Sequence, residues 1–168
     1  ESKICNWKNP YRLLAEKQTL IVYGPAERSD KIEVRTDLLF NFLEAMHSAL
    51  IIYFYRRVRD TNAIALQHWV GKTIHNLLEH EKKKNKYGDT SAYVAWPGFI
   101  AACEALDPMH REQISAFMFR AGRQSGMGMF DTASDVATKV WAAREDTGSL
   151  DVSWSDILAT SKNGLIVT

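Results

Sequence analysis

The chain has 168 residues, of which 46% are hydrophobic, and its formal net charge is +1. This length and apolar content indicate one domain with a real core and exclude a mostly disordered chain. The near-zero net charge gives no electrostatic reason for the chain as a whole to bind nucleic acid or an anionic membrane surface.

The cysteine pattern indicates a reducing, intracellular setting. Cys5 and Cys103 are the only cysteines, and their spacing fits neither a zinc motif nor a disulfide framework. The chain opens at Glu1 without a methionine, so we read it as a piece of a longer protein.

Residues 1–35 are interpreted as an N-terminal arm or linker. Trp7 and Tyr11 are expected to pack on the core, with a linker from a preceding part of the protein as the alternative. Residues 19–24 (TLIVYG) have a strand-like pattern, although a helix end or an extended segment fits equally well in a helical domain. Residues 25–35 are polar and predict a loop.

Residues 36–60 form the longest apolar stretch and predict the central helix. Apolar side chains recur there at three- and four-residue steps, and neither proline nor glycine interrupts them. The last turns are apolar nearly all round, so other elements should cover this helix on several sides. Thr36 is the predicted N-cap. The uncharged part is shorter than the roughly 20 residues that a bilayer span needs, which excludes a membrane helix.

The rest of the chain alternates amphipathic segments with polar turns. The predicted helices cover residues 63–84, 96–106, 108–122, 130–144 and 152–161. Residues 79–86 (EHEKKKNK) are expected to be a solvated tail, Gly122 a helix stop, and residues 165–168 an apolar tail that docks on the core. The sum is an all-α fold: a single helical domain, residues 36–168, of about six helices around a buried central helix.

No residue pattern indicates catalysis or a metal site. His75 and Glu79 would share one helix face, but zinc needs three or four converging ligands, so ordinary polar surface is the better reading. Cys103 lies in an apolar stripe, which is typical of an inert buried thiol. The glycine-rich stretch at residues 122–128 does not follow a strand, so a phosphate-binding loop is not supported.

Two carboxylates on otherwise buried helices, Glu44 and Glu104, are the strongest candidates for a functional role. An unpaired buried charge is costly, so each needs a partner. The candidate partners are Arg56, Arg57, Arg111 and Arg120. Either these groups form structural ion pairs, or one of them orients a polar ligand in a helical pocket. The arginines at residues 56–59 are read as helix-end cations, with a nucleic-acid contact as the alternative.

Three motifs in order resemble the C-terminal regulatory domain of fungal zinc-cluster transcription factors. They are EAMHSALIIYFYRRVRD (residues 44–60) followed by LQHWV, then WPGFIAACEALDPMHREQISAF (residues 96–117), and then Trp141 with Ser153, Trp154 and Asp156. The resemblance covers roughly residues 36–160, and within the family it is strongest to the arginine-metabolism regulators. The ending GLIVT departs from the family pattern, which leaves the role of the tail open.

The resemblance implies a nuclear regulator of transcription without catalytic activity. Its zinc cluster and DNA contact would lie in a separate module, because that module needs a tight run of cysteines that these residues lack; no cofactor is expected here. The expected partners are a small metabolite and transcriptional coregulators, with a homodimer left open and no membrane. The predicted ligand-binding residues, taken from the two carboxylates and the motifs, are Glu44, Tyr53, Arg56, Trp96, Phe99, Glu104 and Arg111.

Three rival interpretations remain at this point. The first is a protein-interaction scaffold without a ligand, which an exposed apolar groove would favour. The second is an enzyme of a helical class, which a polar pocket with converging histidine and carboxylate groups would favour. The third is a folding unit cut from a longer helical domain.

Overall fold

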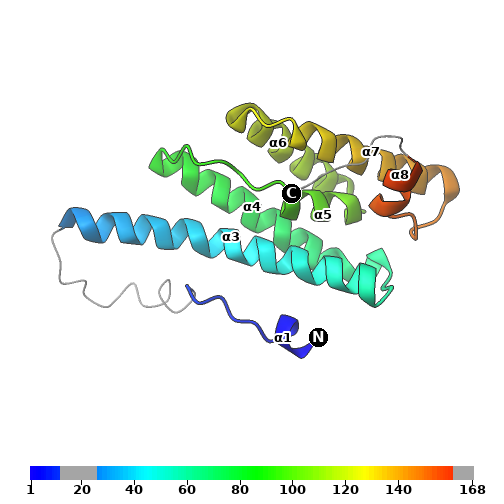
Figure 1. Ribbon diagram of the computed structural model, residues 1–168, viewed down its shortest axis with the longest axis horizontal. Coiled ribbons are helices and arrows are strands. Elements are labelled where there is room, and N and C mark those ends of the chain that lie inside the picture. The colour runs from blue at the N-terminus through cyan, green and yellow to red at the C-terminus, as the bar shows by residue number, and fades with distance from the viewer. Residues whose placement is uncertain (12–25, 161–168) are drawn as a thin grey trace.

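The computed structural model describes residues 1–11 and 26–160, and every regular element in that part of the chain is helical (Figure 1). The elements, in chain order, are α1 (Ser2–Cys5), α3 (Ala26–Val58), the short 3₁₀ helix η1 (Ala63–Leu66), α4 (Gln67–Tyr87), α5 (Trp96–Glu104), α6 (Pro108–Ser125), α7 (Met129–Thr147) and α8 (Trp154–Thr160). One hydrophobic cluster contains residues of every helix from α3 through α7. The all-α class and the single domain are therefore confirmed.

The helices are stacked in layers. α3 packs along α4, and α5 lies against both of these helices. α6 and α7 cover the far side of α4 and α5, and α8 returns to pack on α7 (Figure 1). Residues 1–11, which we call the arm, lie along the opposite face of α3. The core therefore sits between α3 and the α6–α7 layer.

The short helix α5 is the most enclosed element. Every residue from Pro97 to Ala105 is buried. In α3, Ala45, Ala49 and Ile52 are buried in the core, whereas Leu50 and Tyr53 are 41% and 37% exposed. The predicted central helix is thus covered on its α4 and α5 side and partly open on the side of the arm.

Contrary to the argument from length made on the sequence, the segment Thr36–Val58 is long and apolar enough to cross a membrane by length and composition alone. A core helix of a globular protein meets the same test, and this one contacts α4, α5 and α1.

The N-terminal boundary of α3 differs from the prediction. The helix begins at Ala26, so residues 26–35 are helical rather than a loop, and Thr36 lies inside the helix rather than at its N-cap. The polar sequence AERSDKIEVR suggested a loop, yet it holds good helix formers and neither proline nor glycine. Residues 19–24 and 165–168, the predicted strand and docking tail, lie outside the described residues.

Other boundaries follow their capping residues. The Asn62 side chain accepts a hydrogen bond from the Ile64 amide, and the Asp107 side chain accepts one from the Met109 amide. Pro97 lies in the first turn of α5. The prediction that Gly122 stops α6 is wrong, because the helix continues to Ser125 and ends at Gly126, whose φ of 67° is left-handed.

The lysine run at the end of α4 is not wholly solvated, contrary to the prediction. Lys84 is fully buried. Its ammonium donates to the Ser91 carbonyl at 2.5 Å and to the Ser91 hydroxyl at 2.6 Å, pairs with Asp89 at 3.2 Å, and lies 4.8 Å from the Tyr93 ring centroid. This cluster fastens the segment after α4 to the bundle.

Candidate functional site

Three adjoining cavities lie along the open face of α3. The first, of about 390 Å³, is apolar and lies between α3, α5 and α8. The second, of about 220 Å³, is polar and lies beyond Trp154, which lines both cavities. The third, of about 450 Å³, lies between the arm, α3 and Trp96. Leu50 and Trp96 line both the first and the third, so these two cavities lie next to each other.

Aromatic rings shape the first cavity, which we call the aromatic cavity. Its lining residues are Leu50, Tyr53, Trp96, Phe99, Ile100, Trp154 and Leu158. The Tyr53 and Trp96 rings are 6.2 Å apart between centroids, and Trp154 meets Phe99 edge-to-face at 5.7 Å. Rings from three helices are therefore held in tilted contacts around a space that admits an apolar group.

The second cavity, which we call the polar cleft, contains a buried charge cluster. Oε2 of Glu104 lies 3.1 Å from Nε of Arg56 and accepts a hydrogen bond from Arg144 at 2.9 Å. All three side chains are at least nine-tenths buried. Arg56 also donates to the carbonyls of Thr61 and Leu150. The partners that a buried carboxylate requires are thus present.

Nearer the opening, the cleft is lined by exposed charges. Arg57 donates to the Ser155 hydroxyl at 2.7 Å and lies over the Trp154 ring. Two hydrogen bonds from Ser153 hold the pKa of Asp156 below its usual value. Asp60 and Asp151 complete the lining.

Side chains from other helices bind the C-terminal carbonyls of α5, directly behind the polar cleft. Trp141 donates to the Ala102 carbonyl at 2.8 Å, and Arg144 donates to that of Cys103 at 2.9 Å. Gln67 donates to the Glu104 carbonyl and Arg111 to the Ala105 carbonyl. These bonds satisfy groups that a helix end leaves without intrahelical partners. Arg144 thereby joins the charge cluster to the end of α5.

The structure brings five of the seven predicted ligand-binding residues to one place. Tyr53, Trp96 and Phe99 line the aromatic cavity, and Arg56 and Glu104 line the polar cleft.

The other two residues lie elsewhere. Glu44 pairs with Lys72 at 2.9 Å, and Arg111 pairs with Glu145 at 2.6 Å while stacking on Trp141. Glu44 and Arg111 therefore each form an ion pair between two helices near the surface, and neither residue lines any of the three cavities.

Sequence reasoning missed the second arginine partner of Glu104. Arg144 lies on α7, forty residues away in the chain, and was not among the candidate partners. The sequence does hold one sign of this role: Arg144 follows Trp141 by three residues, so the two side chains share a helix face. Both of them contact the end of α5.

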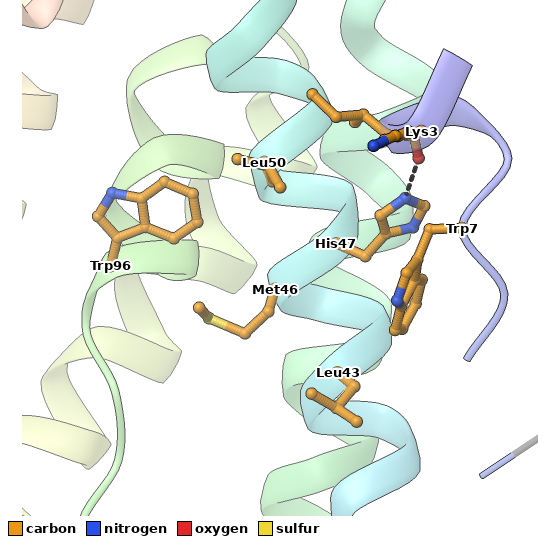
Figure 2. A pocket seen from close by; sticks show the side chains of 8 residues that line it. Lys3, Trp7, Leu43, Met46, His47, Leu50 and Trp96 are labelled. Atoms are coloured by element: carbon orange, nitrogen blue, oxygen red, sulfur yellow. Dashed lines mark hydrogen bonds between the residues drawn. The ribbon is translucent and has the colours of Figure 1, made fainter. Parts of the chain in front are cut away.

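The third cavity has almost wholly apolar walls (Figure 2). Leu43, Met46 and Leu50 line its α3 side, and the Trp7 ring of the arm lies against His47 in a tilted contact with ring centroids 4.6 Å apart. The His47 ring nitrogen Nε2 lies 2.7 Å from the Ile4 carbonyl. The buried Asn9 side chain donates to the Phe40 carbonyl, which fixes the arm further along α3.

The described residues hold no group of three or more histidine, cysteine or acidic side chains placed to bind a metal ion. Burial raises the pKa of the Cys103 thiol well above its usual value, so the thiol stays protonated and unreactive.

One family of known proteins matches the chain. Its description is a fungal specific transcription factor domain, and the match spans residues 1–168. No match was found among curated proteins or among solved structures. The matched residues include all three cavities and the charge cluster behind them.

Proposed function

Because the chain belongs to the fungal-specific transcription factor domain family, we propose that it is the regulatory domain of a zinc-cluster activator and that a small metabolite controls its state. Membership in this family confirms the resemblance and supports a role in transcription regulation. The subtype of the arginine-metabolism regulators stays a prediction. On this proposal the full protein is nuclear and contacts DNA through a separate module.

The observation that carries the metabolite proposal is the aromatic cavity next to the polar cleft. Trp154 separates an apolar space from a charged one, which is the arrangement that a ligand with an apolar body and a charged end requires. An amino acid or a related zwitterion has this chemistry. Glu104 is already paired with both Arg56 and Arg144, so the ligand's charges would be met by Arg57 and the acids nearer the opening.

Such a ligand would act by favouring one arrangement of α8. This helix supplies Trp154 and Leu158 to the aromatic cavity and packs mainly on α7. A ligand that binds the closed arrangement better than an open one shifts the population toward the closed state. Partners that bind only one arrangement would then respond to the metabolite.

Thermal unfolding of the chain with a panel of amino acids and related metabolites tests this proposal. A ligand that binds only the native state stabilises it by about 2.7 kcal/mol at a hundredfold excess over Kd. We expect one compound to raise the unfolding temperature in a saturable way, and Tyr53→Ala to abolish that rise. Phe119→Ala, at an exposed position on α6, is the control. No rise with any compound would count against metabolite binding.

A ligand-free scaffold within a transcription complex is the second candidate function. The open apolar face of α3, with Leu50 and Tyr53 partly exposed, favours it. A protein that binds this face with no metabolite present would support the scaffold.

A further inference from the structure

We propose that the third cavity and the adjoining part of α3 form a groove that binds an acidic amphipathic helix of a partner protein. We call it the arm groove: α3 supplies its floor, Trp7 of the arm one wall, and Trp96 of α5 the other. The inference rests on the regulatory role proposed above and does not require a metabolite.

The floor of the groove has the spacing that a packed helix requires. Leu43, Met46, Leu50 and Tyr53 follow one another at steps of three, four and three residues. This is the heptad pattern by which one helix packs against another. The stripe spans about 15 Å at 1.5 Å per residue, which is nearly three helical turns. In the described part of the chain, α4 and α5 pack on the other side of α3, and Leu50 and Tyr53 of this stripe are partly exposed, so the described helices leave room here for a further helix.

The walls of the groove are held in place before any partner binds. His47 contacts the Ile4 carbonyl and lies against the Trp7 ring, and the buried Asn9 donates to the Phe40 carbonyl. On the other side, Trp96 begins α5 and contacts Tyr53. Figure 2 shows Met46 and Leu50 on the Trp96 side of α3, with Trp7 and His47 on the other side. A rigid apolar groove reduces the ordering cost of binding.

The charges around the groove favour an acidic occupant. Lys3 lines the cavity, and Lys8 follows Trp7 in the arm. Among the described residues, neither lysine has an acidic partner within ion-pair distance. The carboxylates on this face are engaged, Glu1 with Arg59 and Glu44 with Lys72. The acids of the polar cleft line neither apolar cavity.

A partner helix with apolar residues at heptad spacing and glutamates on its flanks would therefore fit. Its apolar side chains would enter between the two tryptophan walls, and its glutamates would face the arm lysines. Apolar anchors at this spacing are the usual way in which a helix binds a groove. The charge arrangement would mainly raise the association rate and favour partners with a negative charge.

The test measures binding of three labelled peptides to the full 168-residue chain by fluorescence anisotropy. The first peptide carries leucines at heptad positions with glutamates elsewhere, over about 14 residues or four turns. The second replaces the glutamates with lysines, and the third scrambles the first. We expect saturable binding of the acidic peptide, at least about tenfold weaker binding of the other two, and weakening by added salt.

Matched variants place the binding site. Leu50→Glu should weaken binding of the acidic peptide by at least about tenfold, whereas Phe119→Glu, which is 61% exposed on α6, should not. Lys3→Glu should reduce the preference for the acidic peptide. Circular dichroism checks that each variant keeps its helices.

Three results would overturn the proposal. They are no binding of the acidic peptide, equal binding of acidic and lysine peptides, and equal effects of Leu50→Glu and Phe119→Glu. A dimer in sedimentation that Leu50→Glu dissociates would assign the groove to a second copy of the chain instead. A metabolite shift in thermal unfolding without peptide binding would overturn this inference and leave the metabolite proposal standing.

Discussion

At the scale of single residues, Glu104 is the charge on which the core depends. One of its oxygens meets both Arg56 and Arg144, and the two guanidinium groups in turn bind the carbonyls of four different residues: Thr61, Leu150, Cys103 and Val152. The carboxylate therefore holds the ends of α3, α5 and α7 together through its partners. A ligand in the polar cleft would lie against this cluster.

Glu104→Ala should lower the free energy of unfolding by about 3–5 kcal/mol, because it leaves two buried arginines without their counter-ion. Urea unfolding followed by circular dichroism measures the loss. Glu145→Ala is the control, since Glu145 is exposed in its pair with Arg111 and exposed pairs contribute at most about 1 kcal/mol. Equal losses in the two variants would contradict the role given to Glu104.

Asp89 should make stability depend on acid pH. Hydrogen bonds from Ser91, with the nearby Lys84 ammonium, lower the pKa of Asp89 to about 2. A folded-state pKa below the unfolded value stabilises the fold above pH 3.8, and this stabilisation is lost as the pH falls toward 2.

Urea unfolding at a series of acid pH values tests this. Asp89→Asn should be less stable than the native chain at neutral pH and should lose less stability between about pH 4 and pH 2. An unchanged pH dependence in Asp89→Asn would show that Asp89 does not contribute.

Residue types and spacing predicted part of this chemistry. Glu104 stood out because a carboxylate on an apolar helix needs a partner, and Arg56 was among the candidates. Arg144 and the burial of Lys84 were not predicted, because both depend on tertiary contacts. A lysine in a charged run is usually solvated. Lys84 is buried because residues 89–93 pack over the end of α4 and bind its ammonium group.

At the scale of elements, α5 is a short helix that tertiary contacts maintain. Nine residues are too few for a stable isolated helix in water. Packing against four helices stabilises α5 instead, together with the side chains that bind its last carbonyls. The aromatic cavity needs this support, because Trp96 and Phe99 are both on α5.

Two glycines in helices should respond differently to alanine. A Cβ at Gly122 would meet the Cβ of Phe130 at 3.1 Å, and relief requires α6 and α7 to move apart. A Cβ at Gly98 would meet only side-chain atoms at 3.6 Å or more, which is ordinary contact. We expect Gly122→Ala to lower the free energy of unfolding by about 1–3 kcal/mol and Gly98→Ala to change it by less than about 1 kcal/mol.

Chemical denaturation of both glycine variants measures the difference. A Gly122→Ala protein as stable as the native chain would show that the α6–α7 contact tolerates the added methyl group.

Element boundaries were predictable where a residue leaves the backbone little choice. Pro97, Asp107 and Asn62 mark helix starts for reasons of capping and ring geometry. The early start of α3 and the late end of α6 were missed for opposite reasons. The polar residues before Thr36 suggest a loop, yet their types favour a helix; Gly122 suggests a stop, yet its close packing on Phe130 explains why a glycine lies there.

At the scale of the whole molecule, the arm is attached to one face of the helical bundle. α1 contacts α3, and no other extensive contact joins it to the described helices. The core cluster contains no residue of the arm. The bundle from α3 to α8 should therefore fold without residues 1–11.

Deleting residues 1–11 should leave a cooperatively folded helical protein. We expect its far-ultraviolet circular dichroism to keep the helical signature and its unfolding temperature to fall by several degrees, at roughly 2–4 °C for each kcal/mol lost. The acidic peptide should bind this shortened chain more weakly, because Trp7 and Lys3 are gone. Loss of a cooperative transition would show that the arm belongs to the core.

The burial of Lys84 has a consequence for chemical labelling. Its ammonium is inaccessible while α4 and residues 89–93 stay together, so an amine-reactive reagent reaches it only after they separate. Lys82, which is largely exposed on the same helix, reacts without any opening. The ratio of the two labelling rates, read by mass spectrometry, therefore reports how often this part of the bundle opens and whether a bound ligand or partner slows that opening.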